Sequence, residues 1–120
     1  MFSFLACKSN EGETNNVATT IGESRNFTKL EIQSAFNCVF EKFKEFEGCV
    51  LLRISYNEKL SNREFGKNDK NSIKVYSDFY VKQNGGDGSL EQDYTYKNWS
   101  WILVRNNETL NWKVKDWGYA

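Results

Sequence analysis

The sequence contains no histidine and no proline, and it has only three cysteines in 120 residues. Without histidine, Ser-His and Cys-His nucleophiles, histidine metal clusters and a side chain that titrates near neutral pH are excluded. Without proline, no X-Pro turn or rigid linker marks a domain boundary. Any catalysis would therefore depend on carboxylates, tyrosines, lysines or thiols.

The chain also lacks a net charge, because 16 basic residues balance 16 acidic residues. Electrostatic binding of nucleic acid or of an anionic membrane needs a clustered basic excess, so we expect neither partner. A length of 120 residues favours one domain. Aromatic residues make up 16% of the chain, which predicts a tightly packed aromatic core.

Residues 1–26 are typical of a signal remnant followed by a polar tether. A short apolar stretch ends in Ala6 before Cys7, as at the end of a bacterial lipoprotein signal, where the cysteine becomes lipidated. The basic and long apolar parts of such a signal are missing, so the hypothesis requires a truncated start. Residues 8–26 are polar, and we expect them to remain unordered.

We predict an extracytoplasmic, membrane-anchored lipoprotein that meets the membrane only through Cys7. The alternative, if Met1 is the true start, is a cytoplasmic protein with an inert thiol.

Residues 27–48 carry the clearest helical pattern. Thr28 and Glu31 form a capping box, and Phe27 and Ile32 occupy the positions of a hydrophobic staple. Apolar residues recur at spacings of three and four, and charged residues take the opposite side. The apolar set comprises Ile32, Ala35, Phe36, Val39, Phe40, Phe43 and Phe46. Gly48 is a natural residue to follow the helix. We predict a helix with its phenylalanine face in the core.

The rest of the chain alternates apolar and polar residues, as strands do. We predict strands at 49–56 and 72–82 and a hairpin over 98–119, with its loop at 106–109. The charged connection 57–71 contains at most a short helical turn at 60–65. This order predicts an α+β domain over residues 27–120, with an N-terminal helix packed on a curved antiparallel sheet of about four strands. Bulges are the usual source of such curvature.

The glycine-rich segment 83–97 is a longer loop than usual, and such loops tend to be functional or mobile. An EF-hand register places Gln83 and Tyr94 where carboxylates are needed, so that motif fails. A looser calcium site would use Asp87, Glu91 and Asp93. The favoured alternative is a flexible loop, and we predict no metal and no cofactor.

Cys38 and Cys49 could form a disulfide in an exported protein. A helix rises about 1.5 Å per residue, which places Cys38 more than two turns from Gly48, whereas the bridge needs Cα atoms within about 7 Å. We therefore favour two separate thiols that behave as small core residues. A catalytic thiol is disfavoured because no histidine can activate it.

Five stretches together resemble a known family, and the resemblance covers residues 27–119. They are EFEGC (45–49), YNEK (56–59), GGDG (85–88), NWSWILVR (98–105) and WKVKDWGY (112–119). The chain is similar to a family of small uncharacterised bacterial extracytoplasmic proteins, often lipoproteins of Gram-positive anaerobes. The resemblance implies a cystatin-like or NTF2-like fold and a lipid anchor. That family supplies no catalytic residues.

Our first functional hypothesis is a noncatalytic module that binds a small-molecule or protein ligand on the concave sheet. Aromatic side chains would anchor the ligand, and one acidic and one basic residue would fix its polarity. The candidates are Tyr76, Asp78, Tyr80, Trp99, Trp101 and Arg105. For the tryptophans, packing in the core is the simpler alternative.

The second hypothesis is a small cone-shaped enzyme, similar to an isomerase, with a carboxylate base and a tyrosine donor. Asp116 alternates in phase with Trp112 and Val114, so a strict period would direct it inward, while Asp78 shares a strand with Tyr76. Trp117 and Tyr119, which follow Asp116, are further residues to test for chemistry. A third possibility is an inhibitor or immunity-type protein that binds a partner through the 83–97 loop.

Overall fold

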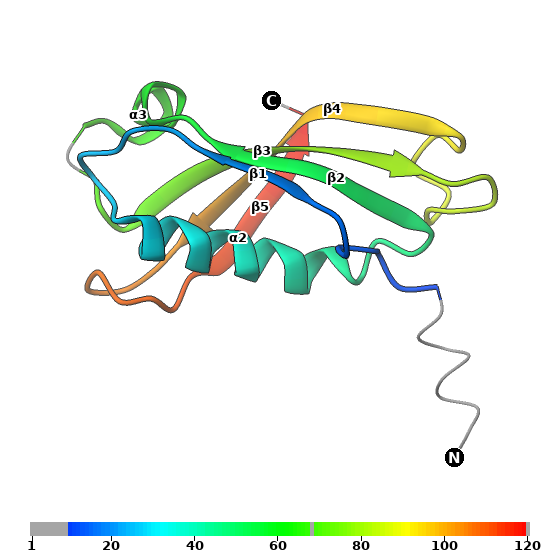
Figure 1. Ribbon diagram of the computed structural model, residues 1–120, viewed down its shortest axis with the longest axis horizontal. Helices are drawn as coiled ribbons and strands as arrows, with labels where there is room; N and C mark the ends of the chain where they lie inside the picture. Colours follow the sequence, from blue (N-terminus) through cyan, green and yellow to red (C-terminus); the bar gives the residue numbers. More distant parts are fainter. Residues whose placement is uncertain (1–9, 68, 120) are drawn as a thin grey trace, which may run out of the picture.

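Helix α2 (Lys29–Phe43) lies across the concave face of a five-stranded sheet in the computed structural model, which describes residues 10–67 and 69–119 (Figure 1). The strands follow in chain order: β1 (Ala18–Ile21), β2 (Cys49–Tyr56), β3 (Ser72–Val81), β4 (Tyr94–Val104) and β5 (Lys113–Tyr119). Strand β1 runs parallel to β2, and the other neighbours are antiparallel. A second helix, α3 (Glu58–Phe65), joins β2 to β3. The predicted α+β class is confirmed, with one strand more than predicted.

The predicted start of helix α2 is confirmed in detail. Thr28 Oγ1 accepts a hydrogen bond from Glu31 N at 3.1 Å, and Glu31 Oε1 accepts one from Thr28 N at 2.8 Å. These two bonds satisfy backbone donors that a helix start otherwise leaves unpaired. The predicted end just before Gly48 is wrong, because the helix ends at Phe43.

The N-terminal segment explains why the helix ends early. Gly12 N donates to Lys44 O at 3.1 Å, and Gly48 N donates to Asn10 O at 3.0 Å, so this segment crosses the end of the helix. A Cβ atom at position 12 would lie 2.0 Å from Phe43 O, so only glycine fits this close approach. The chain after Phe43 therefore turns instead of continuing the helix.

Residues 10–26 are ordered, contrary to the expectation for a polar tether. Glu13 bridges Val50, and β1 pairs with β2 from Ala18 to Ile21. The polarity of this segment was a poor guide because an edge strand is held by backbone hydrogen bonds and needs little apolar burial. Cys7 lies outside the described residues.

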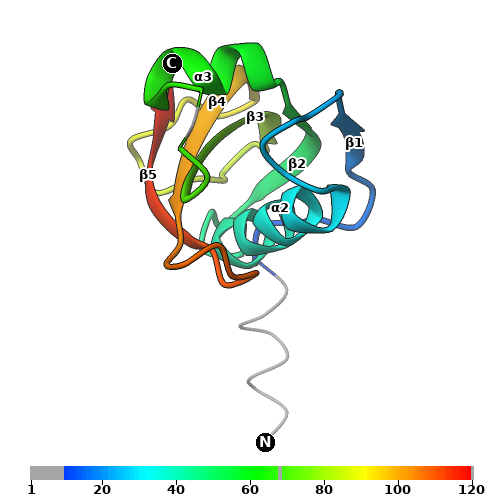
Figure 2. The ribbon, with the colours of Figure 1, turned by 90° about the vertical axis from the view of Figure 1, so that its left-hand side faces the viewer.

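Irregular strand pairing curves the sheet around α2, as expected, and Figure 2 shows the strands arching over the helix. The register shifts between Leu51 and Arg53 of β2, between Ser77 and Phe79 of β3, and between Ile102 and Leu103 of β4. Each extra residue bends its strand and raises the local twist. The alternation expected from the sequence changes phase at the extra residues of β2 and β5, whereas the alternation of β3 is unbroken.

The core lies between the helix and the concave face of the sheet. Helix α2 contributes Ile32, Ala35, Phe36, Val39 and Phe43, all buried. The sheet contributes alternate residues, among them Leu51, Ile54, Ile73, Val75, Phe79, Trp101 and Leu103. The phenylalanine face predicted for the helix is therefore the helix side of the core.

The core has two ends, which we name by the course of α2. At the closed end the helix begins, next to Arg105 and Trp112, which follow β4 and precede β5. At the open end the helix has finished and Phe46 lies beside Trp99 of β4 and Trp117 of β5. The candidate functional residues divide between these two ends and the outer face of the sheet.

Candidate functional site

Three of the predicted binding residues lie on the outer face of the sheet, away from the helix. Tyr76, Asp78 and Tyr80 alternate along β3 with buried residues. Asp78 Oδ1 accepts a hydrogen bond from Asn98 N at 2.9 Å, and Tyr80 donates its hydroxyl proton to Asp93. These residues are thus separated by the sheet from the predicted tryptophans.

Trp101 is a core residue and not a ligand contact. Its side chain is 0% exposed, and its Nε1 donates to Ser77 Oγ at 2.8 Å. Trp99 shares the concave face but lies nearer the open end, where its ring packs edge-on to Phe79 at 5.1 Å. Trp99 therefore remains a candidate binding residue, whereas Trp101 does not.

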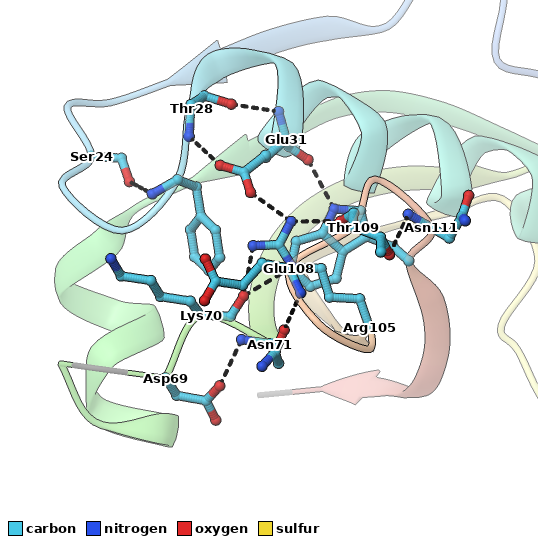
Figure 3. Close-up of polar contacts among 12 residues, drawn as sticks. Ser24, Thr28, Glu31, Asp69, Lys70, Asn71, Arg105, Glu108, Thr109 and Asn111 are labelled. Carbon is cyan, nitrogen blue, oxygen red and sulfur yellow. Dashed lines mark hydrogen bonds and ion pairs between the residues drawn. The ribbon is translucent and has the colours of Figure 1, made fainter.

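Arg105 is buried at the closed end, where it ties three segments together (Figure 3). Its Nε and Nη2 donate to Lys70 O at 2.9 and 2.7 Å, and Nη1 donates to Thr109 O at 2.7 Å. Nη1 also pairs with Glu31 Oε2 at 2.6 Å. These contacts engage all three guanidinium nitrogens inside the fold, so Arg105 stabilises the closed end and offers little free surface to a ligand.

Aromatic rings complete the Arg105 site. The guanidinium carbon lies 4.3 Å from the ring centroid of Trp112 and 5.4 Å from that of Phe27. Burial raises the pKa of Glu31, but the hydrogen bond from Thr28 N and the contact with Arg105 outweigh it, so the net pKa is lowered. The carboxylate therefore stays ionised beside its cation.

Asp116 does not point inward, so the prediction of an inward-facing catalytic base at this position is wrong. The pairing of β4 with β5 moves from Ile102 with Asp116 to Leu103 with Val114, which leaves Lys115 as an extra residue. This bulge reverses the alternation, because one added residue turns every later side chain to the other face. Asp116 is exposed, and its Oδ1 accepts a hydrogen bond from Trp117 N.

The bulge that turns Asp116 outward turns Trp117 inward. Trp117 packs against Phe46 and Trp101, with centroids 6.4 and 6.1 Å away. Tyr119, two residues on, packs against Trp99 at 5.5 Å. The sequence analysis selected this end of β5 for testing, but it predicted that Asp116, and not Trp117, faces inward.

Cys38 and Cys49 are free thiols, so the disulfide hypothesis is wrong and the alternative of separate thiols holds. Cys38 Sγ donates to Trp112 O at 3.3 Å, and Cys49 Sγ donates to Glu47 O at 3.6 Å. Burial, with a smaller contribution from the charge of Asp87, raises the pKa of Cys49 to about 11. Neither thiol is activated for nucleophilic attack.

A tyrosine-carboxylate pair that the sequence did not predict lies near the closed end. Tyr56 donates its hydroxyl proton to Glu58 Oε1 at 3.0 Å, and Glu58 also accepts from the Ser24 hydroxyl and from the backbone N–H groups of Arg25 and Asn26. Burial raises the pKa of Glu58, but these bonds more than offset it, and the net pKa is lowered. With its acceptor capacity filled, Glu58 anchors a turn and is unsuited to act as a base.

The open end contains a cleft of about 380 Å³. Its walls come from the turn after α2, from the glycine-rich loop, and from β4 and β5. The lining residues are Glu45, Phe46, Glu47, Gly86, Asp87, Ser89, Leu90, Trp99 and Trp117. We call this the aromatic cleft. The volume falls in the lower part of the range for small-ligand sites, which combine apolar walls with a few polar groups.

Glycines hold the loop against the turn that forms the opposite wall. A Cβ atom at Gly85 would lie 2.5 Å from Gly48 O, and Gly86 N donates to Glu47 O at 2.7 Å. The loop is shorter than predicted, because β4 begins at Tyr94 and takes in residues assigned to the loop. Its glycines thus serve close backbone packing at the edge of the cleft.

The cleft is acidic as well as aromatic. Hydrogen bonds from the Ser89 side chain and backbone lower the pKa of Asp87, so this carboxylate is charged at neutral pH. Lys42 Nζ, just outside the cleft, lies 3.0 Å from Glu45 Oε1 and 5.0 Å from the ring centroid of Trp117. Trp99 Nε1 is buried and has no acceptor within the described part of the chain.

Sequence reasoning found part of this site. Trp99 was a predicted binding residue, Trp117 was marked for testing, and Asp87 belonged to the calcium hypothesis. Helical spacing placed Phe46 on the apolar face of the predicted helix and Glu45 and Glu47 on its solvent-exposed face. These assignments failed because helical spacing does not reveal the early end of α2. Across residues 10–67 and 69–119, no three metal-ligating side chains gather as a metal site would require, so Asp87, Glu91 and Asp93 do not form one.

No family model, curated protein or solved structure matches this chain. In the described ranges, no helix combines the length and apolar character that a membrane span needs.

Proposed function

We propose that the protein is a noncatalytic binding module that takes its ligand into the aromatic cleft. The observation that carries this proposal is a concave site of about 380 Å³ with Phe46, Trp99 and Trp117 in its walls. Trp117 is 41% exposed although it belongs to the concave face, so a ligand can cover a large aromatic surface there. Binding, not catalysis, is supported because Asp116 is exposed and Asp78 and Tyr76 lie on the outer face of the sheet.

The four tryptophans provide a direct test by two-dimensional proton–nitrogen NMR of their Nε1 groups. Trp99 and Trp117 line the cleft, whereas Nε1 of Trp101 and of Trp112 are bonded inside the molecule. Titration with benzyl alcohol as a neutral aromatic probe should shift the first pair of signals and leave the second pair in place. Equal shifts of all four signals, or no shifts, would contradict the proposal.

A pair of variants assigns the binding to the cleft. Trp117→Ala removes one wall and should weaken the binding of benzyl alcohol by roughly tenfold, the value of about 1.4 kcal/mol of lost contact. Tyr76→Ala removes an aromatic residue from the outer face and should leave the affinity unchanged. If Tyr76→Ala weakens binding as much as Trp117→Ala, the ligand site lies on the outer face.

A protein partner that binds the 83–97 loop is the second candidate, and one observation favours it. Tyr94, Trp117 and Tyr119 are among the most exposed large apolar residues, and Tyr119 lies within packing distance of Tyr96 and Trp99 beside the cleft. Exposed apolar patches of this kind often mark interfaces. Leu30→Ser, at an exposed apolar residue of α2, is the control for Tyr119→Ser in a pull-down from cells that express the protein. Loss of a bound protein on Tyr119→Ser alone would favour this candidate.

We also propose that the α+β fold is of the cystatin-like or NTF2-like kind and that Cys7 carries a lipid. One long helix held in a curved, mostly antiparallel sheet supports the first proposal. The order of an apolar stretch, Ala6, Cys7 and a polar segment supports the second. Metabolic labelling with an alkyne fatty acid should mark the natural gene product and not its Cys7→Ser variant. Labelling of both, or of neither, would contradict the lipid proposal.

A further inference from the structure

The polar groups of the aromatic cleft are all suited to one kind of ligand charge. Three of its lining residues, Glu45, Glu47 and Asp87, are acidic, and none of the described lining residues is basic. Asp87 is held in its charged form by hydrogen bonds from Ser89. Carboxylates around an apolar hollow disfavour an anionic ligand and attract a cation.

The aromatic walls have the same preference. Phe46 stands nearly perpendicular to Trp99, at 89° with centroids 6.4 Å apart, and at 60° to Trp117. Rings set at large angles around one space can present more than one face to a guest. The negative face of an aromatic ring attracts ammonium and guanidinium groups, and tryptophan does so best.

The chain already uses this chemistry at both ends of the core, as well as on the outer face of the sheet, where Lys74 lies over Tyr76 and pairs with Glu64. At the closed end, Arg105 lies over Trp112 and Phe27 and pairs with Glu31. At the margin of the cleft, Lys42 lies over Trp117 and pairs with Glu45. The second case is the more informative, because both partners of Lys42 are lining residues of the cleft. An ammonium group is thus already bound by the side chains that would meet a ligand.

We propose that the aromatic cleft binds a small organic ammonium compound. This inference rests on the proposed binding function and adds the chemical class of the ligand. The cation lies among Phe46, Trp99 and Trp117, with Glu47 and Asp87 as counter-charges. The small volume of the cleft, about 380 Å³, favours a small molecule over a folded partner.

Three probes of similar size and different charge test the inference: benzyltrimethylammonium, benzyl alcohol and phenylacetate. The readout is again the Nε1 signals of Trp99 and Trp117. Benzyltrimethylammonium should bind at least roughly fivefold more tightly than benzyl alcohol, and phenylacetate most weakly. If benzyl alcohol binds as tightly as the cation, the ammonium inference fails and the proposed binding function stands. If no probe binds, the proposed function fails as well.

Charge-neutralising variants locate the counter-charges. Glu47→Gln and Asp87→Asn should each weaken the binding of benzyltrimethylammonium by roughly two- to fivefold and leave that of benzyl alcohol unchanged. Glu91→Gln is the matched control. It makes the same change of charge in the loop that contains Asp87, but Glu91 does not line the cleft. Equal losses of affinity in all three variants would indicate that the cation responds to the overall electrostatic field of the protein. That outcome would overturn the assignment of Glu47 and Asp87 as counter-charges.

Lys42→Gln distinguishes a site for cations from a merely acidic surface. Without the lysine, Glu45 and one face of Trp117 are released, so affinity for benzyltrimethylammonium should rise by roughly twofold or more. A fall in affinity would overturn the inference. The pentapeptide Gly-Gly-Lys-Gly-Gly serves as the last probe, and tighter binding of this peptide than of benzyltrimethylammonium would overturn the assignment to a small molecule.

Discussion

The two ends of the core contain the same types of side chain, but only one end supplies its own cation in a buried position. At the closed end, Arg105 is 5% exposed and lies among Trp112, Phe27 and the carboxylate of Glu31. At the open end, aromatic rings and carboxylates surround a cleft, and Lys42 meets them only from outside. The difference indicates that the contacts of the closed end stabilise the fold, whereas the open end leaves its aromatic rings and carboxylates accessible to solvent.

Arg105→Ala should be one of the two most destabilising changes, because it removes the cation that joins the start of α2 to two loops. Loss of one partner of a buried ion pair costs about 3–5 kcal/mol, since the other charge and the carbonyl groups remain without a partner. The free energy of unfolding measured in urea gives this value. Arg105→Lys should recover only part of the loss, because lysine cannot donate in the planar fork that reaches both Lys70 O and Thr109 O.

Arg53→Ala is the matched control, since Arg53 pairs with Asp78 on the outer face of the sheet. Its side chain is 59% exposed and Nε lies 3.8 Å from Asp78 Oδ2. An exposed pair of this kind contributes about 0–1 kcal/mol. If Arg53→Ala and Arg105→Ala destabilise the protein equally, the closed end has no special role.

Trp101→Ala and Trp117→Ala compare a core residue with a neighbouring residue at the open end. Trp101 is fully buried, so its removal should cost about 3–5 kcal/mol through lost burial and the cavity left behind. Trp117 is 41% exposed, so its removal should cost about 1 kcal/mol or less. Urea unfolding measures both values. A loss on Trp117→Ala as large as that on Trp101→Ala would place Trp117 in the core and weaken the case for a binding role.

The sequence predicted the closed end better than the open end. The capping box of Thr28 and Glu31 is a local signal, and the structure has it as predicted. The core alternation of β3 and of the first hairpin strand is likewise local, since it follows from a period of two. These features needed no knowledge of how distant segments meet.

The open end depends on contacts between distant segments, which local patterns do not encode. The helix ends at Phe43 because residues 10–12 cross it, and nothing in residues 27–48 signals that crossing. Trp117 replaces Asp116 on the inner face because of one bulge at Lys115, and a bulge cannot be located from alternation alone. Arg105 was predicted to contact a ligand because its internal partners, Lys70 and Glu31, are far away in the sequence.

Acid should destabilise the closed end more than the open end. We expect this effect to be smaller than the effects of removing Arg105 or Trp101. The net pKa of Glu31 is lowered from the ordinary value of 4.5 in the folded state. A carboxyl group with a lowered folded-state pKa stabilises the protein above its unfolded value, and this contribution is lost as the pH falls through the folded-state pKa. The stability of the wild type should therefore decrease below about pH 4.5 in part through Glu31.

Glu31→Gln isolates this contribution in urea unfolding measured over a series of pH values. At neutral pH the variant should be less stable than the wild type by about 1–3 kcal/mol, because Arg105 loses its counter-charge. The difference should narrow as the pH falls and Glu31 of the wild type becomes protonated. Asp87→Asn is the corresponding change at the open end. The pKa of Asp87 is also lowered, by Ser89, but its side chain is exposed in a loop, so the same series should reveal a much smaller change. A constant difference between wild type and Glu31→Gln at every pH would mean that the charge of Glu31 does not stabilise the closed end.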